Sequence, residues 1–412
     1  MKRIHLIIPY KKEIDAKEIP VLLNPKYELE VFDARVIDFA NRLSLRILRD
    51  VILGKIAPFV ALAFWLRRSN MEKMVTENKY LKTNSVAKAV PIGTVFHVCP
   101  SNVDTMFVYS LMISLLVGNR NILRLSSKTD DNQISYLLHL INEEISTSSP
   151  MLSDYINVVM YERDNDVNIF FSQRSQARVL WGGDEMVRTF IKIDDNVRCR
   201  DLVFSDRISL CLISAESFLA LDDVEQKKLS HLFYNDTYTF DQKGCSSPQQ
   251  VIFLGSEENA AVCADMLFTL VDEIAANEYA QDDYSLASMK YNQLVSNVMQ
   301  GNVSEFQIYS SRLYSVRQKI KGDAIHHCGG GYFHLSVIKS VIELVDLVNI
   351  KYQTLTYFGL KSDELILIEK LTIGRGIDRI VPMGQALDFN YVWDGYNLIE
   401  QLICYKAIKF SN

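Results

Sequence analysis

Cys245 is the residue in this chain with the clearest capacity for covalent chemistry. It stands in residues 240–255, FDQKGCSSPQQVIFLG, where Gly244 leaves space beside the sulfur for a flat acyl group to approach. A polar segment precedes it and a strand pattern over 251–254 follows, so we expect Cys245 on a connection that the scaffold holds in place. A thiolate there could attack an acyl carbonyl. The stretch alone also suits a buried structural thiol, the usual state of an intracellular cysteine.

Three other segments end in residues that could assist such chemistry. Residues 91–102, PIGTVFHVCPSN, read as a strand that ends in a loop. Residues 118–128, GNRNILRLSSK, read as a strand that ends in hydroxyls and a base. Residues 179–188, VLWGGDEMVR, read as a strand, a double glycine and a helix start. Each therefore predicts functional groups at the end of a strand.

The polar and glycine residues of these segments have two readings each. Asn102 could hold an oxyanion, or it could cap the helix that follows, as Asp104 also could. Gly182 and Gly183 would let the backbone approach a ligand, and a helix N-terminus favours phosphate. A double glycine also occurs in ordinary turns. Asp184 follows directly and would repel a pyrophosphate.

The elements that must position these residues alternate between strands and helices. We predict strands over 94–98, 121–125, 158–161, 177–180 and 210–213, with helices over 104–117, 134–145, 168–175 and from 184 to 191. Such alternation indicates a parallel sheet covered by helices on both faces. The GxGxxG fingerprint of ordinary dinucleotide-binding proteins is absent from the sequence.

The remaining segments are less regular. Residues 4–8 predict a strand, 36–66 an amphipathic helical pattern, and 340–348 a helix. The tail over 376–405 predicts a strand, a turn and a helix that Asp394-Gly395 would open.

Composition limits the classes of protein to consider. The 412 residues are 48% hydrophobic and 23% charged, with a net charge of −6, which argues against nucleic-acid binding. The apolar runs over 56–66 and 106–117 are shorter than the ~20 residues of a membrane-spanning helix, so we expect buried helices. The N-terminal apolar run is too short for a signal peptide. Seven cysteines without a CxxC pair indicate thiols in a reducing compartment, and hence a cytoplasmic protein.

The order and spacing of the four segments resemble those of the aldehyde dehydrogenase superfamily. The closest resemblance is to the LuxC-type long-chain acyl-CoA reductases, carried by the GCSSPQ run, the GNRNILR segment and the tail RIVPMG with WDG. It extends over about residues 85–410. It implies an α/β, aldehyde-dehydrogenase-like fold, with a Rossmann-like cofactor domain over 1–205, completed by an oligomerisation tail over 381–412, and an α/β catalytic domain over 206–380.

The resemblance also implies roles for individual residues. Cys245 would be the nucleophile and Asn102 would hold the oxyanion, so that a fatty acyl thioester, either acyl-CoA or acyl-protein, is reduced to an aldehyde. The cofactor-binding residues would be Arg124, Ser126, Ser127, Lys128, Gly182, Gly183 and Gln353. Ser127 stands where NAD-preferring members carry a ribose-binding glutamate, which favours NADPH over NADH. The same charges also suit a solvated strand end.

Alternatives to a reductase stay open. Hydrolysing aldehyde dehydrogenases activate water with a glutamate in an ELGGKS-type segment, and the corresponding stretch here, DLVFSDRIS over 201–209, has none. This disfavours an oxidising aldehyde dehydrogenase. A cofactor-free thiol acyltransferase and a non-catalytic subunit that channels an acylated partner are the other candidates. The family also implies a homo-oligomer, and some members receive acyl groups from an acyl-activating synthetase.

Other residues with chemical potential favour structural roles. A possible metal cluster comprises His326, His327, Cys328 and His334. Adjacent histidines on a strand point to opposite faces, so we predict no metal site. The run 329–331 predicts a turn or a close backbone approach, and His97 a core histidine. The other cysteines are expected to be buried or incidental. No GxSxG, Walker or HExxH motif is present.

Overall fold

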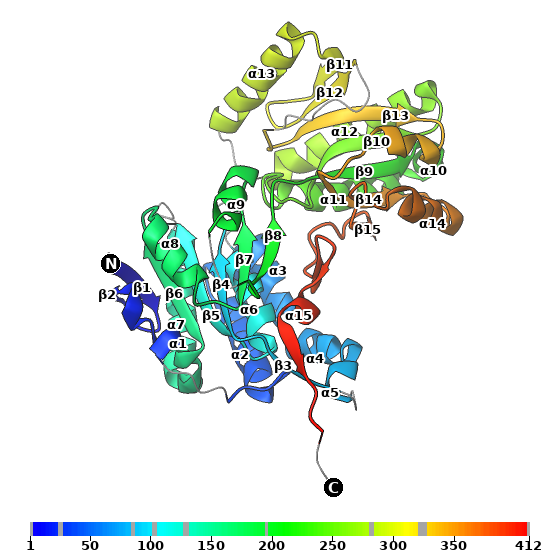
Figure 1. The fold of residues 1–412 in the computed structure, drawn as a ribbon. Coiled ribbons are helices and arrows are strands. Elements are labelled where there is room, and N and C mark those ends of the chain that lie inside the picture. The colour runs from blue at the N-terminus through cyan, green and yellow to red at the C-terminus, as the bar shows by residue number, and fades with distance from the viewer. Residues whose placement is uncertain are drawn as a thin grey trace. The chain divides into compact units, whose positions relative to one another are not determined.

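The chain divides into two compact units, each built on its own seven-stranded sheet (Figure 1). The computed structural model describes residues 3–23, 28–83, 87–100, 105–126, 132–193, 197–279, 284–319 and 328–409. The first unit comprises Met1–Ser205 with Phe389–Asn412, and the second comprises Asp206–Asp388.

The sheet of the first unit has the strand order β2-β1-β6-β5-β4-β7-β8. Its strands are β1 (Arg3–Ile8), β2 (Lys12–Asp15), β4 (Thr94–Val98), β5 (Arg120–Ser126), β6 (Ile156–Tyr161), β7 (Ala177–Trp181) and β8 (Arg200–Phe204). The strands from β6 to β8 are parallel, whereas β1 and β2 are antiparallel at one edge. Every residue of β4 and of β7 is buried, as expected for parallel strands that are covered on both faces.

Helices cover both faces of this sheet (Figure 1). They are α6 (Met106–Leu116), α7 (Asn132–Ser148), α8 (Asn165–Ser172) and α9 (Asp184–Ile191). Apolar side chains of α8 and α9 pack on one face, while α6 contacts β4 and β5. All side chains of α6 are buried, so the apolar run there is a core helix, as predicted. In the part of the chain that the structure describes, no helix is long and apolar enough to cross a membrane.

The helical pattern predicted over 36–66 is two helices, α2 (Ala34–Arg49) and α3 (Ala57–Trp65). Asp50 causes the break. Its backbone is extended, and its carboxylate accepts hydrogen bonds from the N–H groups of Ile52 and Leu53, each over 2.9 Å. The nearby helical segments are α1 (Pro20–Leu23), α4 (Arg68–Glu77) and α5 (Tyr80–Thr83).

The tail differs from the prediction at Asp394-Gly395. These two residues form the turn between β16 (Val392–Trp393) and β17 (Tyr396–Asn397), with φ of 51° and 75°, which suits the tight turn of a β-hairpin. The helix α15 (Leu398–Gln401) begins later and is capped by the side chain of Asn397. After it, β18 (Ile403–Lys406) pairs antiparallel with β3 (Lys88–Pro91).

The sheet of the second unit has the strand order β11-β12-β13-β10-β9-β14-β15. Its strands are β9 (Ile208–Ser214), β10 (Pro248–Leu254), β11 (Val303–Ile308), β12 (Tyr314–Gln318), β13 (Tyr332–Ile338), β14 (Tyr352–Phe358) and β15 (Arg379–Pro382). All except the antiparallel edge strand β11 run parallel.

Alternate residues of β9 supply two cores, as the period of two in a strand requires. Cys211 and Ile213 belong to the core with α11 (Asp223–Tyr238) and α12 (Glu257–Glu278). Leu210 and Leu212 belong to the core with the 3-10 helix η4 (Val341–Asp346) and α14 (Ser362–Leu371). The helix predicted over 340–348 is therefore a short 3-10 turn. The other helices of this unit are α10 (Ala215–Leu219) and α13 (Tyr284–Met299).

Candidate active site

Cys245 lies on the loop between α11 and β10 and is partly buried. The loop turns sharply because Asp241 and Gln242 have φ of 52° and 58°, which non-glycine residues adopt rarely. β10 then begins at Pro248, opposite Ser209 near the start of β9. The parallel pairing therefore places Cys245 at the edge of the sheet where its strands begin.

The buried side-chain amide of Gln242 holds this loop to β13. Its Nε2 donates hydrogen bonds to the carbonyls of Pro248 (2.8 Å) and Tyr332 (3.2 Å). Its Oε1 accepts from the N–H groups of Gly331 (3.0 Å) and Tyr332 (3.1 Å). All four hydrogen-bonding positions of the amide are thus used. Gln242 was not among the predicted site residues, and only its position three residues before the cysteine could have indicated it.

Gly244 and Ser209 shape the backbone around the sulfur. The carbonyl of Gly244 accepts from the N–H of Ser247 over 3.0 Å, and a Cβ on Gly244 would lie 3.2 Å from Ser247 Oγ. The hydroxyl of Ser209 donates to the carbonyl of Cys245 over 2.6 Å and accepts from the N–H of Thr354 over 3.1 Å. A side chain at position 244 would therefore crowd this turn, while the predicted space for an acyl group beside the sulfur stays a prediction.

The glycines 329–331 pack against the same loop, which confirms the predicted close backbone approach. Gly330 donates from its N–H to the carbonyl of Asp241 over 2.8 Å. A Cβ on Gly329 would lie 2.8 Å from that carbonyl oxygen. On the other side, the buried amine of Lys290 donates to the carbonyl of Gly330. The sequence did not indicate Lys290, because a lysine on a helix is usually solvated.

Two fully enclosed polar atoms at this edge have no hydrogen-bond partner among the described residues. They are Ser247 Oγ and Gln353 Nε2. Gln353 lies near the start of β14, next to Thr354, and is 2% exposed. An unpaired buried polar atom costs about 1–3 kcal/mol, so the geometry suits a ligand that supplies an acceptor to Gln353.

Leu387, three residues after the tail motif RIVPMG, lies close to the Cys245 loop. A Cβ on Gly244 would lie 3.7 Å from Leu387, and Leu387 follows a segment that Asp236 holds. The carboxylate of Asp236 accepts from the N–H groups of Gly384 (2.6 Å) and Ala386 (2.9 Å). Burial raises the pKa of Asp236 to about 7, and those two hydrogen bonds act in the opposite direction.

In the first unit, the strand order reverses its direction at β4. The chain runs from β4 through β5 to β6 on one side, then crosses to β7 and β8 on the other. The carboxyl ends of β4 and β7 are adjacent, with Val98 paired to Leu180. In open α/β sheets, ligands bind at such a switch point. The double glycine directly follows β7, so the topology places Gly182 and Gly183 there.

At Gly182 a side chain would collide with the flexible end of Met186. The φ of Gly182 is 156°, and a Cβ there would overlap the terminal methyl group of Met186. Gly183 is the N-cap of α9 and supplies no side-chain cap. Asp184 and Glu185 occupy the first turn of α9. Their negative charge would oppose a phosphate at this helix terminus.

Arg124 and Ser126 lie near the carboxyl end of β5, next to β4 and β6. The guanidinium of Arg124 lies 4.9 Å from the ring centre of Tyr161, and Ser126 is the last residue of the strand. Asn102, Ser127 and Lys128 lie outside the described residues. The predicted residues thus fall into two groups. Cys245 and Gln353 share an edge of the second unit's sheet, while Arg124, Ser126, Gly182 and Gly183 share an edge of the first.

His97 is a core histidine, as predicted. Its ring nitrogens hydrogen-bond to Ser110 Oγ (2.8 Å) and Asn121 Oδ1 (3.0 Å), and burial lowers its pKa to about 4. Cys99, Cys211 and Cys263 are buried, and burial raises the pKa of each thiol. These three are poor nucleophiles because their thiolates are disfavoured.

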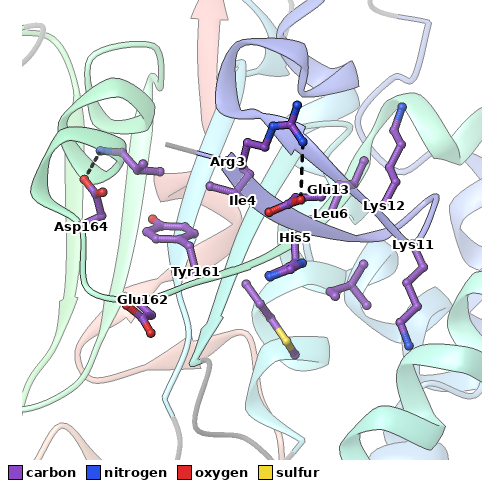
Figure 2. Close-up of a pocket in the computed structure, with 13 residues that line it drawn as sticks. Arg3, Ile4, His5, Leu6, Lys11, Lys12, Glu13, Tyr161, Glu162 and Asp164 are labelled. Atoms are coloured by element: carbon purple, nitrogen blue, oxygen red, sulfur yellow. Dashed lines mark hydrogen bonds and ion pairs between the residues drawn. The ribbon is translucent and has the colours of Figure 1, made fainter. Parts of the chain in front are cut away.

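The structure offers no competing metal centre in the ranges that it describes, since no three His, Cys, Asp or Glu side chains gather to bind an ion. His326 and His327 lie outside those ranges. A groove with a volume of about 700 Å³ lies beside β1, β2 and the end of β6, and the residues that line it are drawn in Figure 2. Its charged lining is balanced, with Arg3, Lys11 and Lys12 against Glu13, Glu162 and Asp164. None of the predicted site residues lines this groove.

Comparison with known proteins supports the family resemblance. Residues 66–405 match the model of a family described as acyl-CoA reductase (LuxC). A long-chain acyl-protein thioester reductase from Aliivibrio fischeri is 26% identical over 172 residues, which are 41% of this chain and 33% of that protein. The matched segment thus spans a third of the length of that relative.

Solved structures of aldehyde dehydrogenases share the fold. The aldehyde dehydrogenase KauB from Pseudomonas aeruginosa has a TM-score of 0.68 at 11% identity, covering 99% of this chain and 93% of that one. A Thermus 1-pyrroline-5-carboxylate dehydrogenase with bound NAD has a TM-score of 0.65 at 12% identity, covering 91% and 80%. These similarities confirm the predicted aldehyde-dehydrogenase-like α/β fold.

Proposed function

The chain belongs to the acyl-CoA reductase (LuxC) family, and from that premise we propose that it reduces a fatty acyl thioester to an aldehyde through Cys245. The observation that carries the proposal is the placement of Cys245. It is a partly buried thiol on a loop held by Gln242, at the same sheet edge as the unpaired amide nitrogen of Gln353.

The proposed reaction has two stages. The Cys245 thiolate attacks the acyl carbonyl carbon, a C–S bond forms, and the thiol of the donor leaves. Addition of a hydride to the enzyme thioester then gives a hemithioacetal, which collapses to aldehyde and the Cys245 thiolate as the C–S bond breaks. Each turnover consumes one acyl thioester, one reduced nicotinamide cofactor and one proton, and releases aldehyde, thiol and oxidised cofactor. Asn102 and a backbone N–H near Cys245 would hold the oxyanion of both tetrahedral species.

A reduced nicotinamide cofactor supplies the hydride when bound. We propose that Gly182, Gly183, Arg124 and Ser126 bind it at the switch point of the first unit's sheet. Ser127 and Lys128 would extend that site, and Gln353 is the remaining residue that we propose to bind the cofactor. The cations and the missing ribose-binding glutamate favour NADPH, with NADH as the alternative. Within the second unit, Gln353 Nε2, which has no partner among the described residues, could donate a hydrogen bond to such a ligand.

We infer the physiological setting from the family resemblance. The name of the Aliivibrio fischeri relative favours an acyl-protein donor beside acyl-CoA, and an acyl-activating synthetase would then be the partner that delivers the acyl group. We also propose a homo-oligomer in the cytoplasm, where the seven cysteines, which are thiols and not disulfides, would stay reduced.

Intact-mass measurement tests the proposal directly. The protein is mixed with a fatty acyl-CoA and then with NADPH. We expect an acyl adduct on Cys245 that NADPH discharges, with aldehyde as the product and no adduct on C245A. A chain that takes up no acyl group from acyl-CoA or from an acylated protein would sink the proposal. An adduct that NADPH does not discharge would instead indicate a hydrolase, if water releases it, or an acyltransferase that waits for its acceptor.

A further inference from the structure

The two peptide groups on either side of the Cys245 α-carbon are both held by hydrogen bonds. The carbonyl of Gly244, in the preceding peptide group, accepts from Ser247 N (3.0 Å) and from Gln249 Nε2 (3.5 Å). The carbonyl of Cys245, in the following peptide group, accepts from Ser209 Oγ (2.6 Å). Two planes that meet at one α-carbon fix its φ and ψ. They therefore fix the direction in which the Cα–Cβ bond, and the sulfur beyond it, projects.

Ser209 joins three strands at this point. It lies near the start of β9 and is fully buried. Its hydroxyl donates to Cys245, at the approach to β10, and accepts from Thr354 N over 3.1 Å in β14. Its own N–H donates to Gln249 Oε1 over 2.7 Å, and the amide of Gln249 in turn contacts the carbonyl of Gly244. The hydroxyl of Ser209 thus holds the peptide group after Cys245, while its backbone N–H supports the preceding one only indirectly, through Gln249.

We propose that Ser209 is a positioning residue that sets the orientation of the Cys245 thiol and its separation from the start of β14, where Gln353 lies. This inference rests on the proposed function of Cys245 as the nucleophile. Ser209 does not touch the substrate. It acts through the carbonyl of Cys245, and only a hydroxyl side chain of this size both donates to that carbonyl and accepts from Thr354.

Chemical labelling of the full-length chain tests the proposal without requiring turnover. Iodoacetamide is added well below the unfolding temperature, and peptide mass spectrometry follows each cysteine separately. In S209A the Cys245 loop loses its hold on the following peptide group. We expect the alkylation rate of Cys245 to rise by about threefold or more, whereas Cys211 and Cys263 in the core stay protected. Acyl transfer from acyl-CoA needs an aligned thiol, so its rate should fall by about tenfold, which corresponds to about 1.4 kcal/mol.

Two further variants separate positioning from general loosening. S209T keeps the hydroxyl and should return both rates towards those of the wild type. S336A removes another buried serine hydroxyl from the same sheet. Ser336 lies on β13, and its hydroxyl accepts a hydrogen bond from Gln250 Nε2 over 3.0 Å. This variant should leave both rates at Cys245 unchanged. The proposal is overturned if S209A matches S336A, or if Cys211 and Cys263 react in parallel with Cys245. Failure of the wild type to accept an acyl group would contradict the proposed function, while the alkylation comparison would still decide the part played by Ser209.

Discussion

The amine of Lys290 donates a hydrogen bond to the backbone carbonyl of Arg312 across 3.1 Å, inside the second unit. The same amine donates to the carbonyl of Gly330, and Gly330 donates to the carbonyl of Asp241 in the Cys245 loop. Burial lowers the pKa of Lys290 to about 8, while Cys328 and Asp272 act in the opposite direction and Arg312 adds to the lowering. A buried amine thus supports the turn on which the Cys245 loop rests.

Replacing Lys290 by methionine should destabilise the protein in a pH-dependent way. K290M leaves two buried carbonyls without this donor, and we expect the free energy of unfolding to fall by about 2 kcal/mol at pH 7.5. The pKa of Lys290 is about 8 in the folded chain and 10.5 in its ordinary state. Between these values the unfolded chain binds more protons, so wild-type stability gains with rising pH.

Urea unfolding of both proteins at pH 7.5 and pH 9.5 measures this effect. The difference between wild type and K290M should widen at pH 9.5. The exposed Lys228 on α11 provides the control, because K228M should follow the wild type at both values. Equal differences at the two pH values would mean that Lys290 does not titrate in this window.

Asp236 should give a pH dependence of the opposite sign. The pKa of Asp236 in the folded chain is about 7, above its ordinary value of 3.8. The folded chain therefore binds this proton more tightly than the unfolded chain, and the resulting stabilisation is fully present below about pH 4. That contribution is lost as the pH rises through 7. D236N cannot titrate, and its single amide oxygen can accept from Gly384 or from Ala386 but not well from both. We expect D236N to be less stable than the wild type by about 1–3 kcal/mol at pH 5.

Urea titrations at pH 5 and pH 8 check this expectation. The difference between wild type and D236N should narrow at pH 8, because only the wild type loses stability over that range. D223N, at the exposed start of α11, should leave the pH dependence as it is. Parallel wild-type and D236N curves would contradict the assignment of a raised pKa to Asp236.

Gln353 should matter for the cofactor and not for the ligand-free fold. Because its Nε2 is buried without a partner among the described residues, Q353L removes an unsatisfied group and should leave the unfolding temperature of the ligand-free protein unchanged or raise it. NADPH should bind about tenfold more weakly, as expected for the loss of one polar contact. Fluorescence titration with NADPH gives the dissociation constant. Unchanged affinity would remove Gln353 from the cofactor site.

The alternation of strands and helices could be predicted from the sequence because parallel strands are buried on both faces and therefore consist of strongly apolar runs. The strands around Val98, Trp181 and Ile213 were predicted within a few residues. Two errors share a physical cause, which is that a local signal has more than one structural outcome. Asp394-Gly395 suits a hairpin turn as well as a helix start. It forms the hairpin turn because β17 pairs with β16. Asp50 looked like one more polar residue in an amphipathic pattern, although its side chain caps the following turn.

The residues that hold the candidate site were less accessible to sequence reasoning than the thiol itself. Cys245 has a recognisable neighbourhood, but Gln242 sits among polar residues that look solvated. Its partners at 331 and 332 come from a strand some 90 positions later. Ser209 likewise depends on Thr354 and on Cys245, each on a different segment. Such partners are set by the pairing of distant strands, and a single sequence does not encode that pairing in any local pattern.

The glycine turn at 329–331, which packs against the Cys245 loop, should not tolerate a side chain at Gly331. The reason is the close contact with neighbouring atoms, in addition to the backbone conformation. Gly331 has φ of 88°, and a Cβ there would overlap the carbonyl oxygen of Arg312 and the hydroxyl of Tyr238. Gly301 has a similar φ of 74° with no heavy atom within 4 Å of the corresponding Cβ. G301A should therefore cost only about 1 kcal/mol, whereas G331A should cost more than about 4 kcal/mol or yield no soluble protein. Soluble yield and urea unfolding compare the two variants. Equal, small losses in both would show that the turn at 329–331 can move away from Arg312, and the support of the Cys245 loop from that side would then be dispensable.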